Sequence, residues 1–229
     1  MNVLYTLRRN YYPYLLWSVR SLLEHNKLTK LYIFAEDDEL PYEIPCKHEI
    51  INMTGQQFLK PDSPNVDSYF TWMSSMRFCS PEIIKANKLI YIDVDTIICD
   101  SLKPLWETDL TGKWIGAVRE HAGTWKPYGK QYFNDGVMVM NLAQMRKDKA
   151  TDQIMGEMNS TYFRFVEQDV INKIAVSAGK VAEVDLRFNE TFCTGYTNNP
   201  AIVHFAGRTD WYQNRNMFRW EYRDKYVTR

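Results

Sequence analysis

The stretch from Lys88 to Ile98, Lys-Leu-Ile-Tyr-Ile-Asp-Val-Asp-Thr-Ile-Ile, predicts a buried strand that ends by presenting two carboxylates. Successive side chains of a strand point to opposite faces, so Asp93 and Asp95 should share one face and Val94 the other. Two neighbouring ionised carboxylates repel each other, and burial strengthens the repulsion. A hard divalent metal would relieve it and could also hold a diphosphate, and a proton on one carboxylate would relieve it as well. Because ligands of a mostly parallel sheet bind just beyond the carboxyl ends of its strands, this stretch predicts a ligand site at that edge.

Strand and helix patterns alternate along the 229 residues. Apolar runs predict strands, and apolar residues at a spacing near 3.6 predict helices. Such alternation indicates an α/β sandwich with a largely parallel sheet, and no repeat or linker divides the chain, which fits one large domain. The predicted strands cover residues 3–6, 31–35, 49–53, 88–98, 114–118, 136–140, 181–186 and 201–205, and the predicted helices cover 15–23, 74–87, 142–159 and 168–178.

The charge balance argues against nucleic acid as the main partner. Lys plus Arg and Asp plus Glu number 28 each, whereas polyanion-binding proteins carry a basic excess. The amino terminus reads as a first strand, without the basic region and apolar core of a signal peptide, and no apolar run is long enough to span a bilayer. The four cysteines are too widely spaced for a paired zinc motif. We therefore expect reduced thiols in a cytoplasmic protein.

Residues 208–229 differ from the rest, because aromatic and basic side chains interleave there. We expect residues 1–207 to form the domain and residues 208–229 to form a segment whose terminal helix packs its aromatic side chains on that domain. Such a segment can also lie on an anionic membrane surface, so a peripheral membrane contact is the alternative. The aromatic residues are Trp211, Tyr212, Phe218, Trp220, Tyr222 and Tyr226, and the basic ones are Arg208, Arg215, Arg219, Arg223, Lys225 and Arg229.

Three further segments carry residue types that suit a ligand site. Residues 132–137 place small and polar side chains at the entry to a strand, where backbone can approach a ligand closely. Residues 167–172 open a helix with acidic residues, and helix capping explains one acid there but not Gln168 and Asn172 as well. A lone histidine such as His204, at the end of an apolar strand, is usually structural. The Asp93 and Asp95 pair favours a ligand role for it.

In these motifs and their order the chain resembles the family 8 glycosyltransferases, the group that includes glycogenin and bacterial lipooligosaccharide galactosyltransferases. The resemblance extends from Met1 to about Trp211 and is most specific in residues 88–110. It implies a single GT-A type domain with a Rossmann-like, mostly parallel sheet flanked by helices, a divalent metal (usually Mn²⁺, with Mg²⁺ as the alternative) and a UDP-sugar donor. It also implies transfer of glucose or galactose to a glycan, a lipid-linked saccharide or another hydroxyl acceptor, with retention of the anomeric configuration.

The resemblance assigns roles residue by residue. Asp93, Asp95 and His204 resemble the metal ligands, and Asp93 should also approach the ribose. Asn10 and Tyr11 match an Asn-Tyr pair whose tyrosine stacks on the base. The other expected contacts are Arg77 at the donor sugar and phosphate, Asn134 and Asp135 around the sugar, Glu167 and Gln168 beneath the anomeric carbon, Glu120 as a looser acidic sugar contact, and Thr6, Val94 and Gly207 along the nucleotide.

Two departures from the family pattern concern the nucleotide. Arg8 and Arg9 stand where the family has acidic residues that read the base. A guanidinium has only donors, so it can contact a base carbonyl but cannot accept the base N–H, and uridine is therefore less firmly implied than the rest. After Gly207 the family's Lys-Pro-Trp becomes Thr-Asp-Trp with one residue missing, so the lysine beside the diphosphate is absent. Arg208 is its natural replacement.

The residue types at the reacting centre favour attack on the same face as the leaving group. Gln168 is a poor nucleophile because an amide oxygen lacks a full negative charge, so we expect it to stabilise the cationic sugar while the leaving phosphate deprotonates the acceptor. Glu167 is the reserve nucleophile for a double displacement. The acceptor should meet the loops at residues 55–69 and 121–130, where no sequence code reveals its identity.

Alternative functions remain open on the sequence alone. Haloacid-dehalogenase-like phosphatases also place Asp-x-Asp after a hydrophobic strand, but they usually continue with Gly-Thr and place the motif on their first strand. A degenerate sugar-nucleotide-binding protein would explain Arg8 and the missing lysine, although the retained Asp93, Asp95, Gln168 and His204 argue against it. Sugar transfer to modified DNA bases is disfavoured by the neutral net charge.

Overall fold

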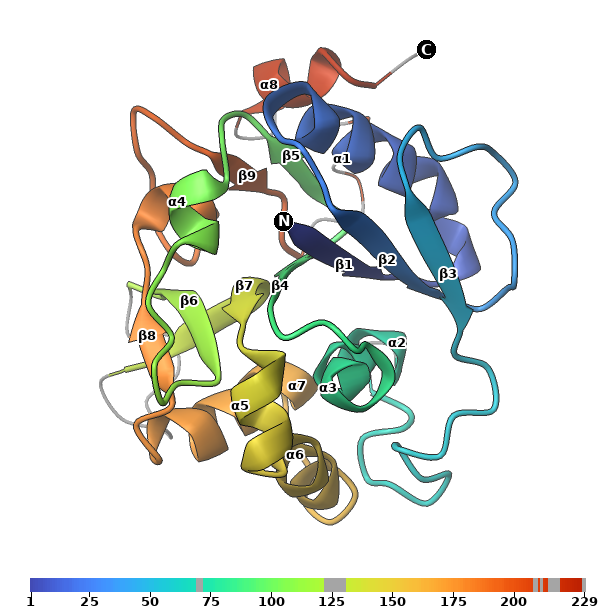
Figure 1. Ribbon diagram of the computed structural model, residues 1–229, viewed down its shortest axis with the longest axis vertical. Helices are drawn as coiled ribbons and strands as arrows, with labels where there is room; N and C mark the ends of the chain where they lie inside the picture. The colour runs from blue at the N-terminus through green and yellow to red at the C-terminus, as the bar shows by residue number, and fades with distance from the viewer. Residues whose placement is uncertain (69–71, 122–130, 208–209, 211, 214–218, 228–229) are drawn as a thin grey trace.

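The computed structural model describes residues 1–68, 72–121, 131–207, 210, 212–213 and 219–227. A seven-stranded sheet runs through the middle of the molecule, with helices on both of its faces (Figure 1). The strand order is β3-β2-β1-β4-β7-β6-β8. The strands are β1 (Asn2–Thr6), β2 (Lys30–Ala35), β3 (His48–Asn52), β4 (Leu89–Ile92), β6 (Ile115–Arg119), β7 (Phe133–Met140) and β8 (Val181–Glu183).

Most neighbouring strands of this sheet are parallel. The parallel pairs are β2 with β3, β1 with β2, β1 with β4, and β6 with β8, whereas β7 runs antiparallel to both β4 and β6. In the register of β1 with β2, Thr6 lies opposite Phe34, so both strands end at the same edge of the sheet. The predicted α/β class with a mostly parallel sheet is confirmed.

Alternation along β1 divides the core into two layers. Val3 and Tyr5 face α1 (Tyr12–His25), which buries Leu15 and Val19 against them. Leu4 faces the opposite layer. There the sheet packs against the other group of helices, α2 (Trp72–Ser75), α3 (Ser80–Ile83), α5 (Leu142–Lys147), α6 (Ala150–Met158) and α7 (Val166–Ile171), which in Figure 1 lie across the sheet from α1.

Two predicted helices are wrong in their extent. The helix expected at 74–87 is a succession of α2, a 3-10 turn (Met76–Cys79) and α3, and it ends at Ile83. Pro81 has no amide hydrogen, so no α-helical bond can form at that position. The helix expected at 142–159 is interrupted at Lys149, whose φ of 53° is left-handed and separates α5 from α6. The helix expected at 168–178 is α7 followed by a π-helical turn (Asn172–Val176).

The predicted strand at 88–98 is also wrong, because the chain leaves the sheet in its middle. β4 ends at Ile92, and the Asp93 amide donates to the carbonyl of Gly136 at 2.7 Å. The Thr96 hydroxyl then donates to the Asp93 carbonyl at 2.8 Å and turns the chain. The chain resumes as β5 (Thr96–Ile98), which pairs antiparallel with β9 (Ile202–His204) outside the central sheet. The two aspartates therefore lie in a loop, and strand alternation does not orient them.

The described part of the carboxyl-terminal segment contacts the domain near α1. Tyr222 and Tyr226 pack beside a small cluster that includes Val203 and Phe205. The Tyr226 hydroxyl donates to Glu24 of α1 at 2.6 Å, and α8 (Trp220–Asp224) lies next to α1 in Figure 1. The division at residue 208 stays a prediction. In the described ranges, none of the helices combines the length and the apolar character that crossing a bilayer requires.

Candidate active site

A cavity of about 400 Å³ lies beyond the carboxyl ends of β1 and β4. This volume is in the range of small-molecule sites. The cavity brings together the predicted site residues except Asn10 and Glu120, which are not among its lining residues, and Arg208, which lies outside the described residues. Its lining consists of Thr6, Leu7, Arg8, Tyr11, Tyr14, Ser74, Arg77, Asp93, Val94, Asp95, Asn134, Asp135, Gly136, Phe165, Glu167, Gln168, His204, Ala206 and Gly207.

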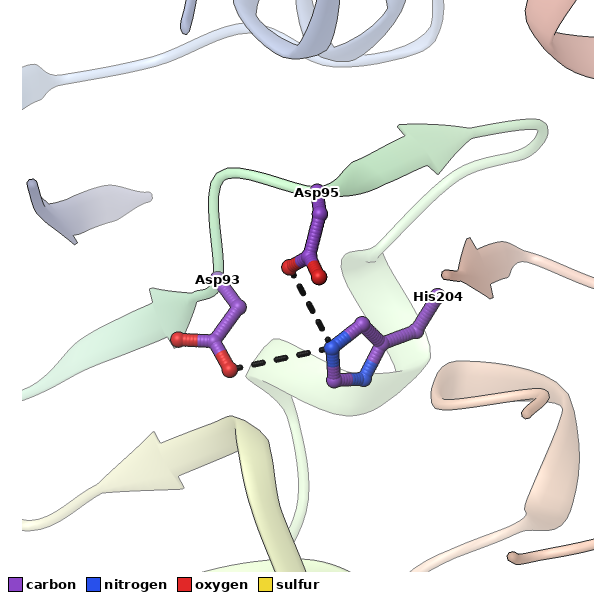
Figure 2. Close-up of side chains that lie close together, drawn as sticks. All are labelled: Asp93, Asp95 and His204. Carbon is purple, nitrogen blue, oxygen red and sulfur yellow. Dashed lines mark ion pairs between the residues drawn. The ribbon is translucent and has the colours of Figure 1, made fainter. Parts of the chain in front are cut away.

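Asp93, Asp95 and His204 converge at one point of this cavity (Figure 2). One possible ligand atom from each lies within 4.8 Å of the others. The Nε2 atom of His204 is 3.4 Å from Asp95 Oδ1 and 3.7 Å from Asp93 Oδ2. Pairing of β5 with β9 produces this arrangement, because it sets His204 opposite Thr96 and the Phe205 amide donates to the Asp95 carbonyl at 2.9 Å. Two carboxylates and an imidazole suit a divalent ion such as Mn²⁺.

Gly136 is the point of closest approach between β7 and this cluster. A Cβ atom at Gly136 would lie 2.2 Å from His204 Cε1 and 2.8 Å from Asp93 Oδ2. Both distances are below any normal contact, so only glycine allows the three ligands to approach as they do. The sequence predicts that the backbone of residues 132–137 approaches a ligand. In the structure, Gly136 approaches His204 and Asp93, two side chains that would bind a metal ion.

Arg77 connects the metal-ligand cluster to the acidic side of the cavity. Its side chain is only 3% exposed, and its guanidinium lies 3.1 Å from Asp93, 3.4 Å from Asp135 and 3.5 Å from Glu167. The guanidinium also donates to the carbonyl oxygens of Asp135 and Ser74, at 2.8 and 2.7 Å, and stacks on the ring of Tyr91 at 4.1 Å. A fork of five N–H donors meets all these acceptors, which a lysine could not do.

The titration of this acidic group shows that negative charge is in excess. Burial raises the pKa of Asp93, of Glu167 and, to about 8, of Asp135, although the Arg77 guanidinium opposes each rise. Asp135, whose pKa lies near 8 although a buried cation is beside it, is therefore in surroundings that are short of positive charge.

The Asp95 and His204 pair titrates in the opposite sense. Burial disfavours the ionised form of Asp95, but the His204 ring, a backbone hydrogen bond and Arg77 together outweigh burial and hold the pKa of Asp95 below its usual value. Burial likewise acts to lower the pKa of His204, and the Asp95 and Asp93 carboxylates together outweigh burial and raise that pKa. A divalent ion bound here would compete with a proton for the His204 ring.

The acidic side of the cavity offers buried acceptors for hydroxyl groups. Within the described ranges, neither Asp135 Oδ2 nor Glu167 Oε2 has a hydrogen-bond partner. Gln168 lies beside them, and its amide nitrogen donates to Glu120 Oε1 at 3.2 Å. Burial raises the pKa of Glu120, and the amide donors of Asn134 and Gln168 oppose the rise. Glu120 does not line the cavity itself, so it reaches the site through these two amides.

Asp169 and Asn172 have structural roles. The Asp169 carboxylate accepts from the Phe165 amide at 2.9 Å, which caps α7, and from the Tyr132 hydroxyl at 2.7 Å. The Asn172 side chain accepts from the Phe133 amide at 2.7 Å and donates to the Phe133 carbonyl at 2.8 Å, so it clips α7 to β7. Helix capping therefore accounts for the acid at Asp169 but not for the acid at Glu167. The two hydrogen bonds to Phe133 account for Asn172.

Aromatic and basic side chains form the other end of the cavity. Tyr11 and Tyr14 lie there, with their ring centroids 6.1 Å apart in an edge-to-face arrangement. Arg8 lies beside them, and its Nε donates to Glu36 Oε1 at 2.9 Å. The Arg9 amide donates to the other oxygen of Glu36 at 3.0 Å. Glu36, which follows β2, therefore holds Arg8 in place, and Arg8 is the residue that stands after β1 where the family has an acid.

Sequence reasoning missed several residues of the site. Tyr14 follows Tyr11 by three positions on one helical face, a spacing that could have revealed it. Tyr91 donates from its hydroxyl to Asp93 and is itself within 3.1 Å of Thr6 Oγ1, but in sequence it is an ordinary strand aromatic. Asn189 contacts His204 from far along the chain, and no local pattern announces it.

The mixed sheet, the Asp-x-Asp loop and the cavity at the strand ends define a GT-A type glycosyltransferase. The solved structure of LgtC superimposes with a TM-score of 0.77 over 99% of this chain and 95% of that one, at 19% identity, which shows the shared fold. The chain belongs to glycosyl transferase family 8, whose family model matches residues 2–211.

Curated relatives agree with the family. A putative glycosyltransferase of Haemophilus influenzae is 27% identical over an alignment of 214 positions that covers 83% of this chain. Glycosyltransferase GlyF of Streptococcus pneumoniae is 25% identical over an alignment of 232 positions that covers 90% of this chain. The matches cover 63% and 57% of those two proteins, so this chain spans about three fifths of their length.

Proposed function

We propose that this chain is a metal-dependent, retaining hexosyltransferase that moves glucose or galactose from a UDP-sugar to a hydroxyl of a glycan, a lipid-linked saccharide or another acceptor. The observation that carries the proposal is the convergence, in one cavity, of three possible metal-ligand side chains, a buried arginine and two buried carboxylates that each keep an oxygen without a hydrogen bond within the described ranges. Solved structures of the galactosyltransferase LgtC, which shares the fold, include a complex with donor and acceptor sugar analogues.

Asp93, Asp95 and His204 would hold the metal ion, with Mn²⁺ favoured and Mg²⁺ as the alternative. The charge balance supports this fit, since Asp93, Asp95, Asp135 and Glu167 together exceed the charge of the Arg77 guanidinium. A bound divalent ion supplies positive charge beside the diphosphate leaving group. Arg77 is fixed by its carboxylate and carbonyl partners, so it keeps Asp93 oriented toward the cluster without the cost of reorganisation.

Asp135 Oδ2 and Glu167 Oε2, which accept no hydrogen bond within the described ranges, would accept hydrogen bonds from hydroxyls of the donor sugar. Such buried acceptors reject ligands that cannot satisfy them, which is how a site selects a polyhydroxylated substrate. Asn134 would contact the same sugar. Gln168, beside Asp135 and Glu167, would direct its amide dipole toward the anomeric carbon, where cationic character develops in the transition state.

Two features support same-face attack over double displacement. Gln168 lacks the negative charge of a good nucleophile. Glu167 faces Arg77, and burial raises its pKa, which lowers the fraction of nucleophilic carboxylate. The bond from the anomeric carbon to the leaving phosphate oxygen breaks, the bond to the acceptor oxygen forms on the same face, and the acceptor proton passes to the leaving phosphate.

The nucleobase would lie between Tyr11 and Arg8, with ring stacking from the tyrosine and a carbonyl contact from the guanidinium. Thr6, Val94 and Gly207 would follow the nucleotide toward the metal ligands, and Arg208 would neutralise the diphosphate. The acceptor would meet residues 55–69 and 121–130, of which 69 and 122–130 lie outside the described residues. A cytoplasmic location and a peripheral membrane contact through the carboxyl-terminal segment complete the proposal.

Membership of family 8 removes the phosphatase alternative. Stereochemistry tests the transferase proposal against the remaining one, a binding protein without catalysis. Proton NMR should show that UDP-α-hexose hydrolysis by the Mn²⁺-loaded protein releases the α-anomer first. Initial release of the β-anomer would contradict retention, and no turnover of any nucleotide sugar would favour the binding protein. A trapped glycosyl adduct on Glu167, seen by mass spectrometry, would replace same-face attack by double displacement.

A further inference from the structure

A chain of amide hydrogen bonds joins His204 to the opposite side of the cavity. The Nδ1 atom of His204 lies 2.8 Å from Asn189 Oδ1, and the amide nitrogen of Asn189 donates to Asn134 Oδ1 at 2.8 Å. The amide nitrogen of Asn134 donates to Glu120 Oε1 at 2.9 Å, and that same oxygen accepts from Gln168 at 3.2 Å. The chain therefore runs from a metal-ligand side chain to the side chain at the reacting centre.

Two fixed groups determine the direction of every bond in this chain. The Gly136 amide is a donor only, and it donates to Asn134 Oδ1 at 3.1 Å. Glu120 Oε1 accepts from Asn134, so the amide of Asn134 has a single possible orientation. Asn189 must then turn its amide nitrogen toward Asn134 and its oxygen toward His204. An oxygen that can only accept requires the proton of a neutral His204 to sit on Nδ1, which leaves the Nε2 lone pair facing Asp93 and Asp95.

We propose that Asn189 is a positioning residue with two separable effects: it fixes His204 in the Nδ1–H form that can bind a metal through Nε2, and it ties His204 to the Asn134, Glu120 and Gln168 side chains. The proposal rests on the proposed function. Outer-shell partners of metal-binding histidines commonly act in the first way, by fixing the ring tautomer and orientation. The second effect is a consequence of the directed chain in this molecule.

Burial and backbone hydrogen bonds hold Asn189 in a fixed position. Its side chain is fully buried, and its carbonyl accepts from the Thr194 hydroxyl at 2.6 Å. The next residue, Glu190, bonds to the residues before and after Val203 in β9, with its amide donating to the Ile202 carbonyl at 3.0 Å and its carbonyl accepting from the His204 amide at 2.9 Å. Asn189 and His204 are therefore held to the same strand, so a change at Asn189 acts on His204 directly.

Substitutions at Asn189 separate the two effects. Asn189→Asp keeps an acceptor for the Nδ1 proton but has no donor for Asn134, whereas Asn189→Leu is similar in shape and offers neither group. We expect the affinity for Mn²⁺, measured by EPR titration of free Mn²⁺, to stay within about threefold of the wild type in Asn189→Asp and to fall about 10- to 100-fold in Asn189→Leu. We expect UDP-sugar hydrolysis by Asn189→Asp at saturating Mn²⁺ to lose about tenfold or more in kcat, because Glu120 and Gln168 lose their support.

Asn65→Ala is the matched control for loss of a buried amide. Its nitrogen donates to the carbonyls of Met158 and Thr161 at 2.6 and 2.8 Å, far from the cluster in sequence and in hydrogen bonding. This variant should lower Tm and leave the affinity for Mn²⁺ unchanged. If Asn189→Leu does not fold, Asn189→Ala takes its place in the titration.

Three results with the Asn189 variants would overturn the proposal. They are an affinity for Mn²⁺ in Asn189→Leu or Asn189→Ala within threefold of the wild type, an equal loss of affinity in Asn189→Asp, and full kcat in Asn189→Asp. A wild-type protein that binds no Mn²⁺ would overturn it too. The Mn²⁺ titration needs no donor sugar, so it tests the role of Asn189 in metal binding independently of catalysis. A protein that binds Mn²⁺ but turns over no sugar nucleotide would refute the proposed function and leave that test intact.

Discussion

Substitution of Gly136 by alanine should remove the metal site while leaving the fold in place. The added Cβ would lie 2.2 Å from His204 Cε1 and 2.8 Å from Asp93 Oδ2. Carbon atoms in contact normally lie about 3.5–4.0 Å apart, so the imidazole must move by more than about 1 Å. Metal–ligand distances tolerate only about 0.2 Å, so the shifted ring can no longer complete the site.

The magnitude follows from losing one ligand of three. We expect the affinity for Mn²⁺ to fall at least about 100-fold, which corresponds to about 2.7 kcal/mol. Overpacking should also lower the free energy of unfolding by about 1–3 kcal/mol, and in a chain of this size each kcal/mol lowers Tm by about 2–4 °C. EPR titration of Mn²⁺ and a thermal melt in EDTA measure the two effects separately.

Two other glycines provide matched controls. A Cβ at Gly116, in β6, would meet Val139 at 2.8 Å and Val184 at 3.0 Å, so Gly116→Ala should lower Tm without changing the affinity for Mn²⁺. A Cβ at Gly156, in α6, would meet nothing within 4 Å, and Gly156→Ala should stabilise the helix by up to about 1 kcal/mol. The reasoning fails if folded Gly136→Ala binds Mn²⁺ within threefold of the wild type.

Further predictions concern the acidic group and the base end of the cavity. The native pKa of Asp135, about 8, exceeds the unfolded value of about 3.9, so the stability from its proton is complete below pH 4 and is lost as the pH rises through 8. We therefore expect the free energy of unfolding of Asp135→Asn, relative to that of the wild type, to rise by at least about 1.4 kcal/mol between pH 5 and pH 9, measured by urea denaturation in EDTA. A difference that does not change with pH would refute the raised pKa. Arg77→Lys leaves buried carboxylates without hydrogen-bonded partners and should lower the free energy of unfolding by about 3–5 kcal/mol. A loss of less than about 1 kcal/mol in the same denaturation assay would contradict this prediction. Arg8→Ala should weaken UDP binding about tenfold in calorimetry. Arg9 pairs with Asp37 and does not line the cavity, so Arg9→Ala should leave UDP binding unchanged. Equal effects of the two substitutions would contradict base contact by Arg8.

The sequence was sufficient for features that depend on local patterns. Apolar runs located the strands of the sheet, and leucine spacing located α1 within a few residues. The Asp93 and Asp95 motif predicted a ligand site at the edge of the sheet where the structure has its cavity, and the ligand itself stays a prediction. Its geometry was misjudged, because the chain leaves β4 at Ile92 only through bonds to Gly136, Thr96 and Phe205, and two of these lie far away in sequence.

Features that depend on distant contacts were out of reach. Nothing near Glu36 indicates that its carboxylate holds Arg8, since the two meet only when β1 and β2 end together. The same is true of Asn189, whose role follows from hydrogen bonds to His204 and Asn134 at separations of 15 and 55 residues. Hydrophobic periodicity carries no information about such polar pairings, because they satisfy buried donors and acceptors rather than a repeating face.

The central claim is that Asp93, Asp95 and His204 hold a metal on which turnover of a sugar nucleotide depends. The direct measurement is release of UDP from a panel of UDP-hexoses, with Mn²⁺, with Mg²⁺ and with EDTA, by the wild type and by Asp95→Asn. We predict release that requires the divalent ion, stops with EDTA, resumes on addition of Mn²⁺ and falls a hundredfold or more in Asp95→Asn. Release that is equally fast in EDTA, or equally fast in Asp95→Asn, would contradict the claim.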